Sequence, residues 1–458
     1  MAATHTSPQL DRWELRSVYS VDHSVPVLAE VDVVVIGAGA AGVAAATVCA
    51  EQGLSVIIVE RYGFAGGAAV AGMSGTICGL YLASDSGAGP EQVVLGFSER
   101  FRKGLAARGG LTEPQRYGKT WTVAHDPQVW REVADDLLYN AGVRILFHTT
   151  LSGVILDGGT HRGVVVDSNA GRAAIHAKRT IDASGDAAAV ARAGWSYYFG
   201  DNGKIQNPTM FFRLGNVNTE AFWEAFGEDT ICPPWVTEQI VADREHGRDL
   251  PREKIWIFKT PRPHELLVNA TRLADSDGRM LNVIDPEDFT IAELLGRKQV
   301  RGYAEFLRRH LDGCADSFVV DTGVEAGIRQ TRSIVGAQTL TNDQVLNCEK
   351  PVDGIVRSPW PIELHDGSRP KLHWLLDDYY EVPYLTLVPE EGEGIIVAGR
   401  CLGAEHEALA SARVTAQCFE YGHAAAWATV LSLSSETRYR DVDPAILRGK
   451  LAAAGSAI

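Results

Sequence analysis

Paired cysteines are missing from this chain. Its 458 residues include seven cysteines, and none of them forms a C-x-x-C pair or another short spacing that suits a metal ion. The sequence therefore excludes a local zinc or iron–sulfur site, and we expect no bound metal. An odd, scattered set of cysteines in a long chain is typical of reduced thiols, which predicts a cytoplasmic protein.

Positive charge is also scarce. Lys and Arg number 43 against 58 Asp and Glu, which gives a formal net charge of −15. Nucleic acids and anionic membranes both bind to clusters of Lys and Arg, so we expect neither as a partner. Residues 1–30 are polar and lack the apolar core of a signal peptide.

Uninterrupted apolar runs are rare as well. The segment Val33–Ala50 has 18 residues without a charge, which is nominally long enough to cross a membrane. Three glycines interrupt it, at Gly37, Gly39 and Gly42, and a Val-rich run precedes them. A soluble strand, turn and helix explain this segment better than a membrane span does.

The order of apolar and turn segments predicts an α/β fold. Val31–Ile36 and Ser55–Glu60 are typical of buried strands, and Ala40–Gln52 between them is typical of a helix. Such a β-α-β unit implies a parallel sheet with a right-handed crossover. Further strands with the alternation of a β-meander are expected at Arg144–His148, Gly153–Leu156 and Gly163–Val166, closed by Arg179–Ala183.

The length of the chain suits two domains, one of them split in the sequence. The pattern of strand-like and helical segments changes near Trp195, and a long helix is expected over Pro286–Leu311. We predict a Rossmann-type nucleotide-binding domain from residues 28–195 and 325–458, with a mixed α+β substrate domain inserted at 196–324. A single long helix is expected from about His406 to Leu433.

The segment Gly37-Ala-Gly39-Ala-Ala-Gly42 has the G-x-G-x-x-G spacing and lies between a strand and a helix, as a dinucleotide fingerprint requires. The first glycine permits the tight turn, the second admits a pyrophosphate, and the third lets helix and strand pack closely. Glu60 ends the next strand, 18 positions after Gly42, where an acid can bind ribose hydroxyls. The sequence therefore predicts a dinucleotide site.

Three features favour FAD over NAD as the dinucleotide. The fingerprint begins close to the first residue of the sequence, as it commonly does in flavoproteins. Arg61 and the Gly66-Gly67 pair follow the acid and give a second close backbone approach. The strand Thr180–Asp186 lies far downstream, as in chains that return to complete an FAD site, and there is no second fingerprint for NAD.

Several blocks together resemble the FAD-dependent oxidoreductases of glutathione-reductase-like fold, which are related to fumarate-reductase and heterodisulfide-reductase-like flavoproteins. The blocks are Gly66-Gly67, Ile181–Asp186, Asn269–Arg272, Gly327–Gly336, Pro361–Asp366, Val382–Tyr384 and Val397–Gly403. The resemblance implies FAD and redox chemistry on a small organic substrate, without fixing which one. Motif and resemblance together place the cofactor at Gly37, Gly39, Ala41, Gly42, Glu60, Arg61, Gly66, Gly67, Ala68, Gly72, Leu151, Ala183, Gly185, Asp186, Gly399 and Arg400.

Four residues are candidates for catalysis. His365 lies in a block that the resemblance places near the substrate, with Asp366 next to it for orientation, and a pKa near neutrality suits proton transfer. On one continuous helix, His406 and Arg413 would share a polar stripe within roughly 60°, and Arg413 could fix a carboxylate. Tyr384 could donate a hydrogen bond to a substrate oxygen.

The leading hypothesis is an FAD-dependent dehydrogenase, oxidase or reductase that passes a hydride between a small organic substrate and flavin N5, with His365 or His406 as acid or base. A flavin monooxygenase is an alternative, although Gly399-Arg400 stands where those enzymes have Gly-Asp. An electron-transfer subunit of a larger complex and a redox-neutral flavin isomerase also stay open, as does homo-oligomerisation.

Overall fold

A seven-stranded sheet organises the larger part of the molecule. The computed structural model describes residues 24–365 and 367–458. The strand order is β6-β2-β1-β9-β8-β7, with β20 also paired to β9. The strands are β1 (Val27–Ile36), β2 (Val56–Val59), β6 (Arg144–Leu146), β7 (Thr150–Asp157), β8 (Thr160–Ser168), β9 (Gly171–Asp182) and β20 (Ile395–Val397). The fold is thus the predicted α/β class with a Rossmann-type parallel sheet.

The parallel part of the sheet comprises β6, β2, β1, the second half of β9, and β20. Apolar side chains fill this part because its strands are buried on both faces, as in Val33–Val35 and Val56–Val59. The first half of β9 pairs antiparallel with β8, and β8 with β7, which makes the β-meander.

One strand of the predicted meander belongs elsewhere. Arg144–His148 was expected to begin the meander, but β6 pairs in parallel with β2 at the opposite edge of the sheet. The cause is α4 (Pro127–Asn140), which precedes β6 and carries the chain back across the sheet. A helical crossover of this kind returns a chain in parallel rather than as a hairpin.

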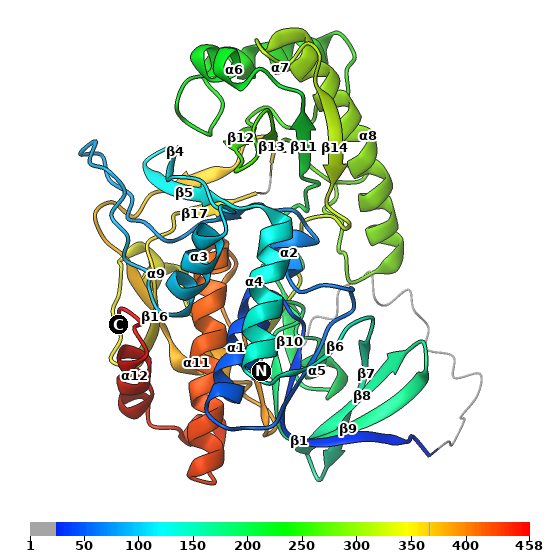
Figure 1. The fold of residues 1–458 in the computed structure, drawn as a ribbon, viewed down its shortest axis with the longest axis vertical. Helices are drawn as coiled ribbons and strands as arrows, with labels where there is room; N and C mark the ends of the chain where they lie inside the picture. Colours follow the sequence, from blue (N-terminus) through cyan, green and yellow to red (C-terminus); the bar gives the residue numbers. More distant parts are fainter. Residues whose placement is uncertain (1–23, 366) are drawn as a thin grey trace.

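Helices pack on the parallel sheet in the lower part of the molecule (Figure 1). α1 (Ala40–Glu51) lies against α11 (Thr415–Ser434), with α3 (Phe97–Ala107) and α4 beside them. The α1–α11 contact is so close that a Cβ on Gly422 would stand 2.0 Å from the Ala41 carbonyl oxygen. No helix in the described ranges is both long enough and apolar enough to pass through a membrane.

The expected helix from His406 to Leu433 is two helices. α10 (His406–Ala412) ends at Arg413, and Val414, with φ −79° and ψ 165°, is the N-cap of α11. Tertiary contacts stabilise the break, because the Ala416 N–H donates to the Cys78 carbonyl rather than to α10. His406 and Arg413 therefore do not share a continuous stripe.

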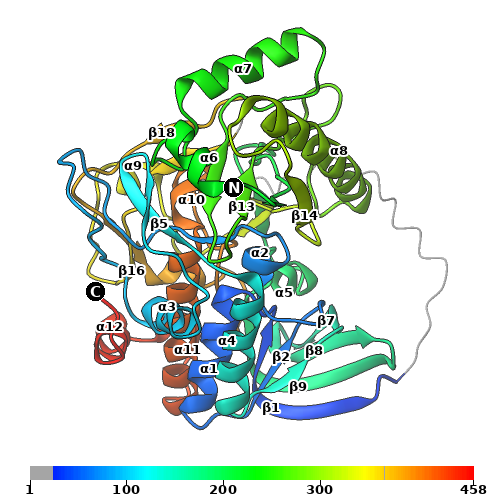
Figure 2. The ribbon, with the colours of Figure 1, turned by 45° about the horizontal axis from the view of Figure 1, so that its top comes forward.

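A second hydrophobic core occupies the upper part of Figures 1 and 2 and gathers buried residues between Met210 and Ala326. The predicted domain boundaries stay a prediction. The elements of this core are β11 (Phe212–Gly215), β12 (Trp256–Lys259), β13 (Leu266–Asn269), β14 (Phe318–Thr322), α6 (Thr219–Phe226), α7 (Pro234–Glu245) and α8 (Pro286–His310). The sheet order is β12-β13-β11-β14, and α8 confirms the long helix expected there.

The remaining elements are short strands and helices outside the two main sheets. Strand groups are β3 (Thr76–Ile77) with β5 (Thr120–Ala124) and β4 (Gln115–Tyr117), β10 (Tyr197–Phe199) with β15 (Arg332–Ile334), β16 (Gly354–Ser358) with β19 (Tyr380–Pro383), and β17 (Ile362–Leu364) with β18 (Lys371–His373). The remaining helices are α2 (Gly67–Val70), α5 (Ala188–Arg192), α9 (Asn342–Leu346) and α12 (Pro444–Ala453), with 3₁₀ turns at Tyr384–Leu387 and Tyr439–Asp441. None of the seven cysteines is in a disulfide.

A buried histidine of this framework predicts loss of stability in mild acid. The His125 ring is buried 4.5 Å from the Trp130 ring, and burial lowers its pKa to about 4. Unfolded histidine binds a proton below pH ~6.5, so this contribution is fully present above that pH and is lost as the pH falls toward 4. The loss amounts to about 3 kcal/mol for one histidine.

The His125→Phe variant removes this titration and keeps an aromatic ring against Trp130. Urea unfolding between pH 7 and pH 4 should therefore show a smaller loss of stability in the variant than in the wild type. If the free energy of unfolding falls by the same amount in both proteins, His125 does not favour its neutral form in the native state.

Candidate functional site

A cavity of about 540 Å³ lies where the two cores meet, a size that suits a small-molecule or cofactor site. One group of lining residues comes from the fingerprint loop, from the end of β2 and from the segments that directly follow β9 and β20. Another comes from elements of the second core and from β17. A further group comes from the break between α10 and α11, where Arg413, Val414 and Thr415 line the cavity.

The fingerprint loop presents bare backbone to this cavity. A Cβ on Gly39 would meet no protein atom closer than Gly67 Cα at 3.6 Å. Gly39 is also the N-cap of α1, which has no side-chain cap and no acid in its first turn. The first N–H groups of α1 are therefore free of side-chain acceptors, which suits a phosphate group.

Gly37 and Gly42 have packing roles in the same loop. Gly37 has φ +92°, and a Cβ there would stand 2.7 Å from the Ala183 carbonyl oxygen. A Cβ on Gly42 would stand 1.8 Å from the Gly37 carbonyl oxygen. Gly42 does not line the cavity, and its place in the fingerprint is explained by close packing of helix and strand.

Glu60 ends the strand segment beside this loop. Its Oε2 accepts from the Ala38 N–H at 2.7 Å, and its Oε1 accepts from the Tyr62 N–H at 2.9 Å. Burial raises the pKa of Glu60, although both hydrogen bonds oppose that shift. Arg61 follows and forms an ion pair with Glu325 from the second core, and both line the cavity.

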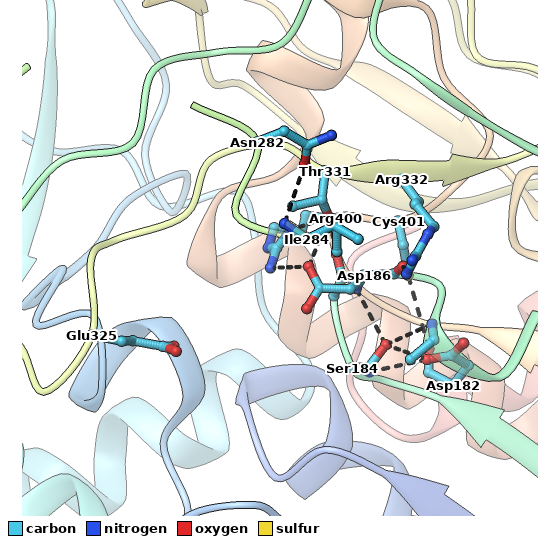
Figure 3. A network of polar contacts seen from close by, with 12 residues as sticks. Asp182, Ser184, Asp186, Asn282, Ile284, Glu325, Thr331, Arg332, Arg400 and Cys401 are labelled. Atoms are coloured by element: carbon cyan, nitrogen blue, oxygen red, sulfur yellow. Dashed lines mark hydrogen bonds and ion pairs between the residues drawn. The ribbon is translucent and has the colours of Figure 1, made fainter. Parts of the chain in front are cut away.

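Asp186 is held by a polar network on the other side of the loop (Figure 3). Its Oδ1 accepts from Arg400 Nη2 at 2.8 Å and from Thr331 Oγ1 at 2.7 Å. Arg400 also donates to Thr331 Oγ1 at 2.9 Å. Burial alone would raise the pKa of Asp186, but Arg400 and Thr331 outweigh burial and lower it, so the carboxylate is ionised.

The structure brings most of the predicted site residues to one cavity. Those that line it are Gly37, Gly39, Ala41, Glu60, Arg61, Gly66, Gly67, Ala68, Leu151, Ala183, Gly185, Asp186, Gly399, Arg400, His365 and Arg413. Gly42, Gly72, Tyr384 and His406 do not line it. A Cβ on Gly72 would stand 3.1 Å from Gly327 Cα, so Gly72 permits a close approach of two backbone segments.

Two catalytic candidates are displaced from the cavity for clear reasons. The Tyr384 hydroxyl donates to the Tyr439 carbonyl at 2.8 Å inside the core, so it does not reach a substrate. His406 begins α10, and its Nδ1 lies close to Gly200, which does not line the cavity. Asp366, expected to orient His365, lies outside the described residues.

Aromatic side chains form one wall of the cavity, which we call the aromatic wall: Tyr117, Phe211, Phe258 and Trp360. The Tyr117 ring lies 5.0 Å from Trp360 and 6.3 Å from Phe258. These rings share a small core with Val414 at the start of α11. The wall therefore adjoins both the second core and the break between α10 and α11.

Glu363 and His365 stand beside this wall. They are two residues apart at the end of β17, and strand alternation directs them to the same side. Tyr117 donates to Glu363 Oε1 at 2.7 Å, and His365 Nε2 lies 3.4 Å from the same oxygen. Arg252 Nη2 lies 3.0 Å from His365 Nδ1. A guanidinium only donates, so Nδ1 accepts and the proton of the ring is on Nε2.

The charge states of this group follow from burial and these contacts. Burial and the nearby Arg329 hold the pKa of His365 well below its usual range, so the ring is neutral. Burial would raise the pKa of Glu363, but the electrostatic interaction and hydrogen bond with His365, the hydrogen bond from Tyr117 and the charge of Arg413 lower it to about 2. The pKa of Tyr117 is raised well above its usual range by burial and by Glu363. In this group, Tyr117 is therefore a neutral phenol, Glu363 a carboxylate and His365 a neutral imidazole.

Sequence reasoning missed four members of this group: Tyr117, Arg252, Arg329 and Glu363. Glu363 had a usable signal, because it alternates with His365 at the end of one strand. Arg329 lies in the block that carries the family resemblance. Arg252 had no such signal in the sequence, since its contact with His365 spans 113 residues.

Comparison with known proteins assigns this architecture to a family. A family model described as FAD dependent oxidoreductase matches residues 32–451. No curated protein matches the chain. Many solved structures do, at low identity.

Three of these structures illustrate the level of likeness. A p-nitrophenol 4-monooxygenase from Pseudomonas putida DLL-E4 has 10% identity and a TM-score of 0.47, covering 93% of this chain and 88% of its own. An L-amino acid deaminase from Proteus vulgaris has 14% identity and a TM-score of 0.46, covering 93% and 95%. A geranylgeranyl bacteriochlorophyll reductase-like protein from Thermoplasma acidophilum has 13% identity and a TM-score of 0.46, covering 93% and 82%.

Proposed function

The chain belongs to the FAD-dependent oxidoreductase family, and we propose that it transfers a hydride between a small organic substrate and flavin N5. FAD is the cofactor of the family, and the enzyme is an FAD-dependent oxidoreductase. A closer relation to fumarate-reductase and heterodisulfide-reductase-like flavoproteins stays a prediction.

One observation carries the proposal. One part of the cavity, the dinucleotide cradle, is lined by Gly39, Glu60 and Asp186. The other part, the chamber, is lined by the aromatic wall, Glu363 and His365. A cofactor in the cradle and a small substrate in the chamber would share one cavity, so the two could come into the contact that hydride transfer requires. Sites of this kind are mostly apolar with a few placed polar groups, as this chamber is.

The cradle residues fit FAD in a consistent way. Gly39 and the N-terminus of α1 would take the pyrophosphate, and the carboxylates of Glu60 and Asp186 would accept hydrogen bonds from hydroxyl groups of the cofactor. When bound there, FAD supplies the acceptor for two electrons and a proton in the form of a hydride.

The chamber residues would orient the substrate beside the flavin. The Tyr117 phenol lines the cavity and is hydrogen-bonded to ionised Glu363. The phenolic oxygen of Tyr117, whose own proton is donated to Glu363, can accept a hydrogen bond from the substrate, with His365 Nε2–H steadying the same carboxylate oxygen. His365 itself has both ring nitrogens engaged, so we assign it a positioning role rather than the acid/base role expected from the sequence.

The decisive experiment is anaerobic. Purified protein should carry FAD, seen by its visible absorbance, and one or more compounds of a metabolite library should bleach that absorbance. Admission of oxygen then shows whether the reduced enzyme reacts as an oxidase or needs another acceptor.

The other outcomes separate the alternatives. Protein that binds no flavin would refute the proposal. Rapid NADPH oxidation stimulated by an aromatic compound would identify a monooxygenase, and turnover of a compound without net change in the flavin would identify an isomerase.

A further inference from the structure

Three guanidinium groups are buried around the chamber, and they have one carboxylate between them. Arg252 and Arg329 are 3% and 7% exposed, and Arg413 is half-buried, with its Nε fully buried. The carboxylate is Glu363, which is also buried. Within the described residues, none of the three arginines forms an ion pair with a carboxylate. An excess of buried positive charge is unfavourable unless an anion compensates it.

The three arginines are not equivalent. Arg252 uses its donors on the protein, with contacts to Lys254, Asn269, Thr271 and His365, and it does not line the cavity. Arg329 and Arg413 do line it. Arg252 is therefore a structural cation behind His365, whereas the other two are accessible to a ligand.

One short segment anchors both accessible arginines. Arg413 Nη2 donates to Gln206 Oε1 at 3.1 Å, and Arg329 Nη1 donates to the Asn207 carbonyl at 2.6 Å. The Asn207 N–H donates in turn to the His365 carbonyl at 3.0 Å. Neighbouring residues of the chain thus hold Arg413, Arg329 and His365 together, although they come from distant parts of the sequence.

Unused donors accompany these two cations. Arg413 Nε, Gln206 Nε2 and the indole Nε1 of Trp360 are buried and have no acceptor among the described residues. The side chains of Gln206 and Trp360 are each only 1% exposed. The N-terminus of α11 adds further positive potential, since its N-cap is Val414, without a side-chain cap or an acid in the first turn. Arg413 and Trp360 line the cavity, so a ligand that accepts hydrogen bonds there would satisfy their unused donors.

We propose that the chamber binds the carboxylate of a small organic acid between Arg329 and Arg413, with the apolar body of the acid on the aromatic wall. This inference rests on the proposed function and specifies its substrate class. A carboxylate accepts and does not donate, and it can take paired hydrogen bonds from a guanidinium. The same anion would relieve the mutual repulsion of Arg329 with Arg252 and Arg413, which, after burial, lowers the pKa of Arg329.

The test titrates holoprotein with sodium benzoate and, separately, with benzamide, which has the same ring and a similar shape but no charge. Perturbation of the flavin absorbance and isothermal titration calorimetry report binding. Benzoate should bind saturably and at least tenfold more tightly than benzamide. The Arg329→Gln and Arg413→Gln variants should each weaken benzoate roughly 10- to 100-fold and keep wild-type FAD content. Arg162→Gln, an exposed arginine of β8, is the matched control and should bind benzoate as the wild type does.

Each other result has a definite meaning. Equal binding of benzoate and benzamide, or no binding of benzoate, would overturn the carboxylate site. Folded variants that lose FAD along with benzoate would assign the two arginines to the cofactor and would also overturn it. If the Gln variants do not fold, the wild-type comparison of benzoate with benzamide decides. Absence of FAD refutes the proposed function alone, because calorimetry detects benzoate without flavin.

Discussion

The Gly39→Asp variant is expected to fold as the wild type does and to bind FAD about a thousandfold more weakly. Gly39 has φ −74° and ψ −171°, an extended conformation that any residue adopts. A Cβ there would meet only Gly67 Cα, at 3.6 Å, so a side chain has room to point into the cavity. Asp is also a favourable N-cap, so α1 should gain stability.

The loss of FAD follows from charge. A carboxylate at the N-terminus of α1 would stand where the pyrophosphate is expected, and two negative charges about 4 Å apart repel by about 4 kcal/mol at an effective dielectric constant of ~20. That energy corresponds to about a thousandfold in affinity. Fluorescence titration of apoprotein with FAD measures the affinity, and thermal unfolding checks the fold.

The matched control separates charge from size. Gly39→Asn has the same shape and also favours the N-cap position, so it should bind FAD more tightly than Gly39→Asp by most of that factor. If both variants bind FAD within tenfold of the wild type, the pyrophosphate does not lie at the N-terminus of α1.

The dinucleotide cradle could be predicted because its information is local. Strand, glycine loop, helix and acid follow one another between Val31 and Glu60, and each residue type has a steric or electrostatic reason to be there. Gly42 illustrates this: its Cβ would collide with the Gly37 carbonyl, five residues before it in the sequence. The parallel sheet followed from the same local pattern.

The break between α10 and α11 could not be predicted, because no Pro or Gly marks it. The sequence there is Ala412-Arg-Val-Thr-Ala416, which a helix tolerates. The helix is interrupted by contacts with distant residues: Arg413 reaches Gln206, and the Ala416 N–H donates to Cys78. Long-range contacts override local propensity, and here the result is that Arg413 lines the cavity.

The chamber was predicted only in part for the same reason. His365 was identified as a residue type suited to proton transfer, but its charge state depends on burial and on Arg329, and its tautomer on Arg252, which contacts it from 113 residues away. The prediction that Asp366 orients His365 falls outside the described residues; within them, the carboxylate that contacts His365 is Glu363. Residues i and i+2 of a strand lie on the same face, so strand alternation favours contact between Glu363 and His365.

The Glu363→Gln variant should be less stable than the wild type by about 3 kcal/mol at pH 7. The pKa of Glu363 is about 2 in the folded protein, against a usual value near 4.5. A carboxyl group with a lowered pKa contributes stability that is fully present above pH ~4.5 and is lost as the pH falls toward 2. Each unit of pKa is worth ~1.36 kcal/mol, which gives the expected magnitude.

Glutamine keeps the shape of Glu363 and removes its charge, so the buried guanidinium groups of Arg252, Arg329 and Arg413 lose their compensating anion. Urea unfolding should show a constant difference between the variant and the wild type from pH 5 to pH 8, narrowing below pH 4.5. The control is Glu393→Gln, because Glu393 forms an ion pair with Arg438 and its side chain is 42% exposed. Exposed pairs contribute ~1 kcal/mol or less, so this control should change little.

Added benzoate tests why the Glu363→Gln variant loses stability. If Glu363 stabilises the fold as the counter-ion of the arginines, saturating benzoate should restore part of the lost stability in Glu363→Gln and should bind that variant at least as tightly as the wild type, since one negative charge has left the chamber. Benzamide should restore none of it. A Glu363→Gln variant as stable as the wild type would show that the three guanidinium groups need no protein anion.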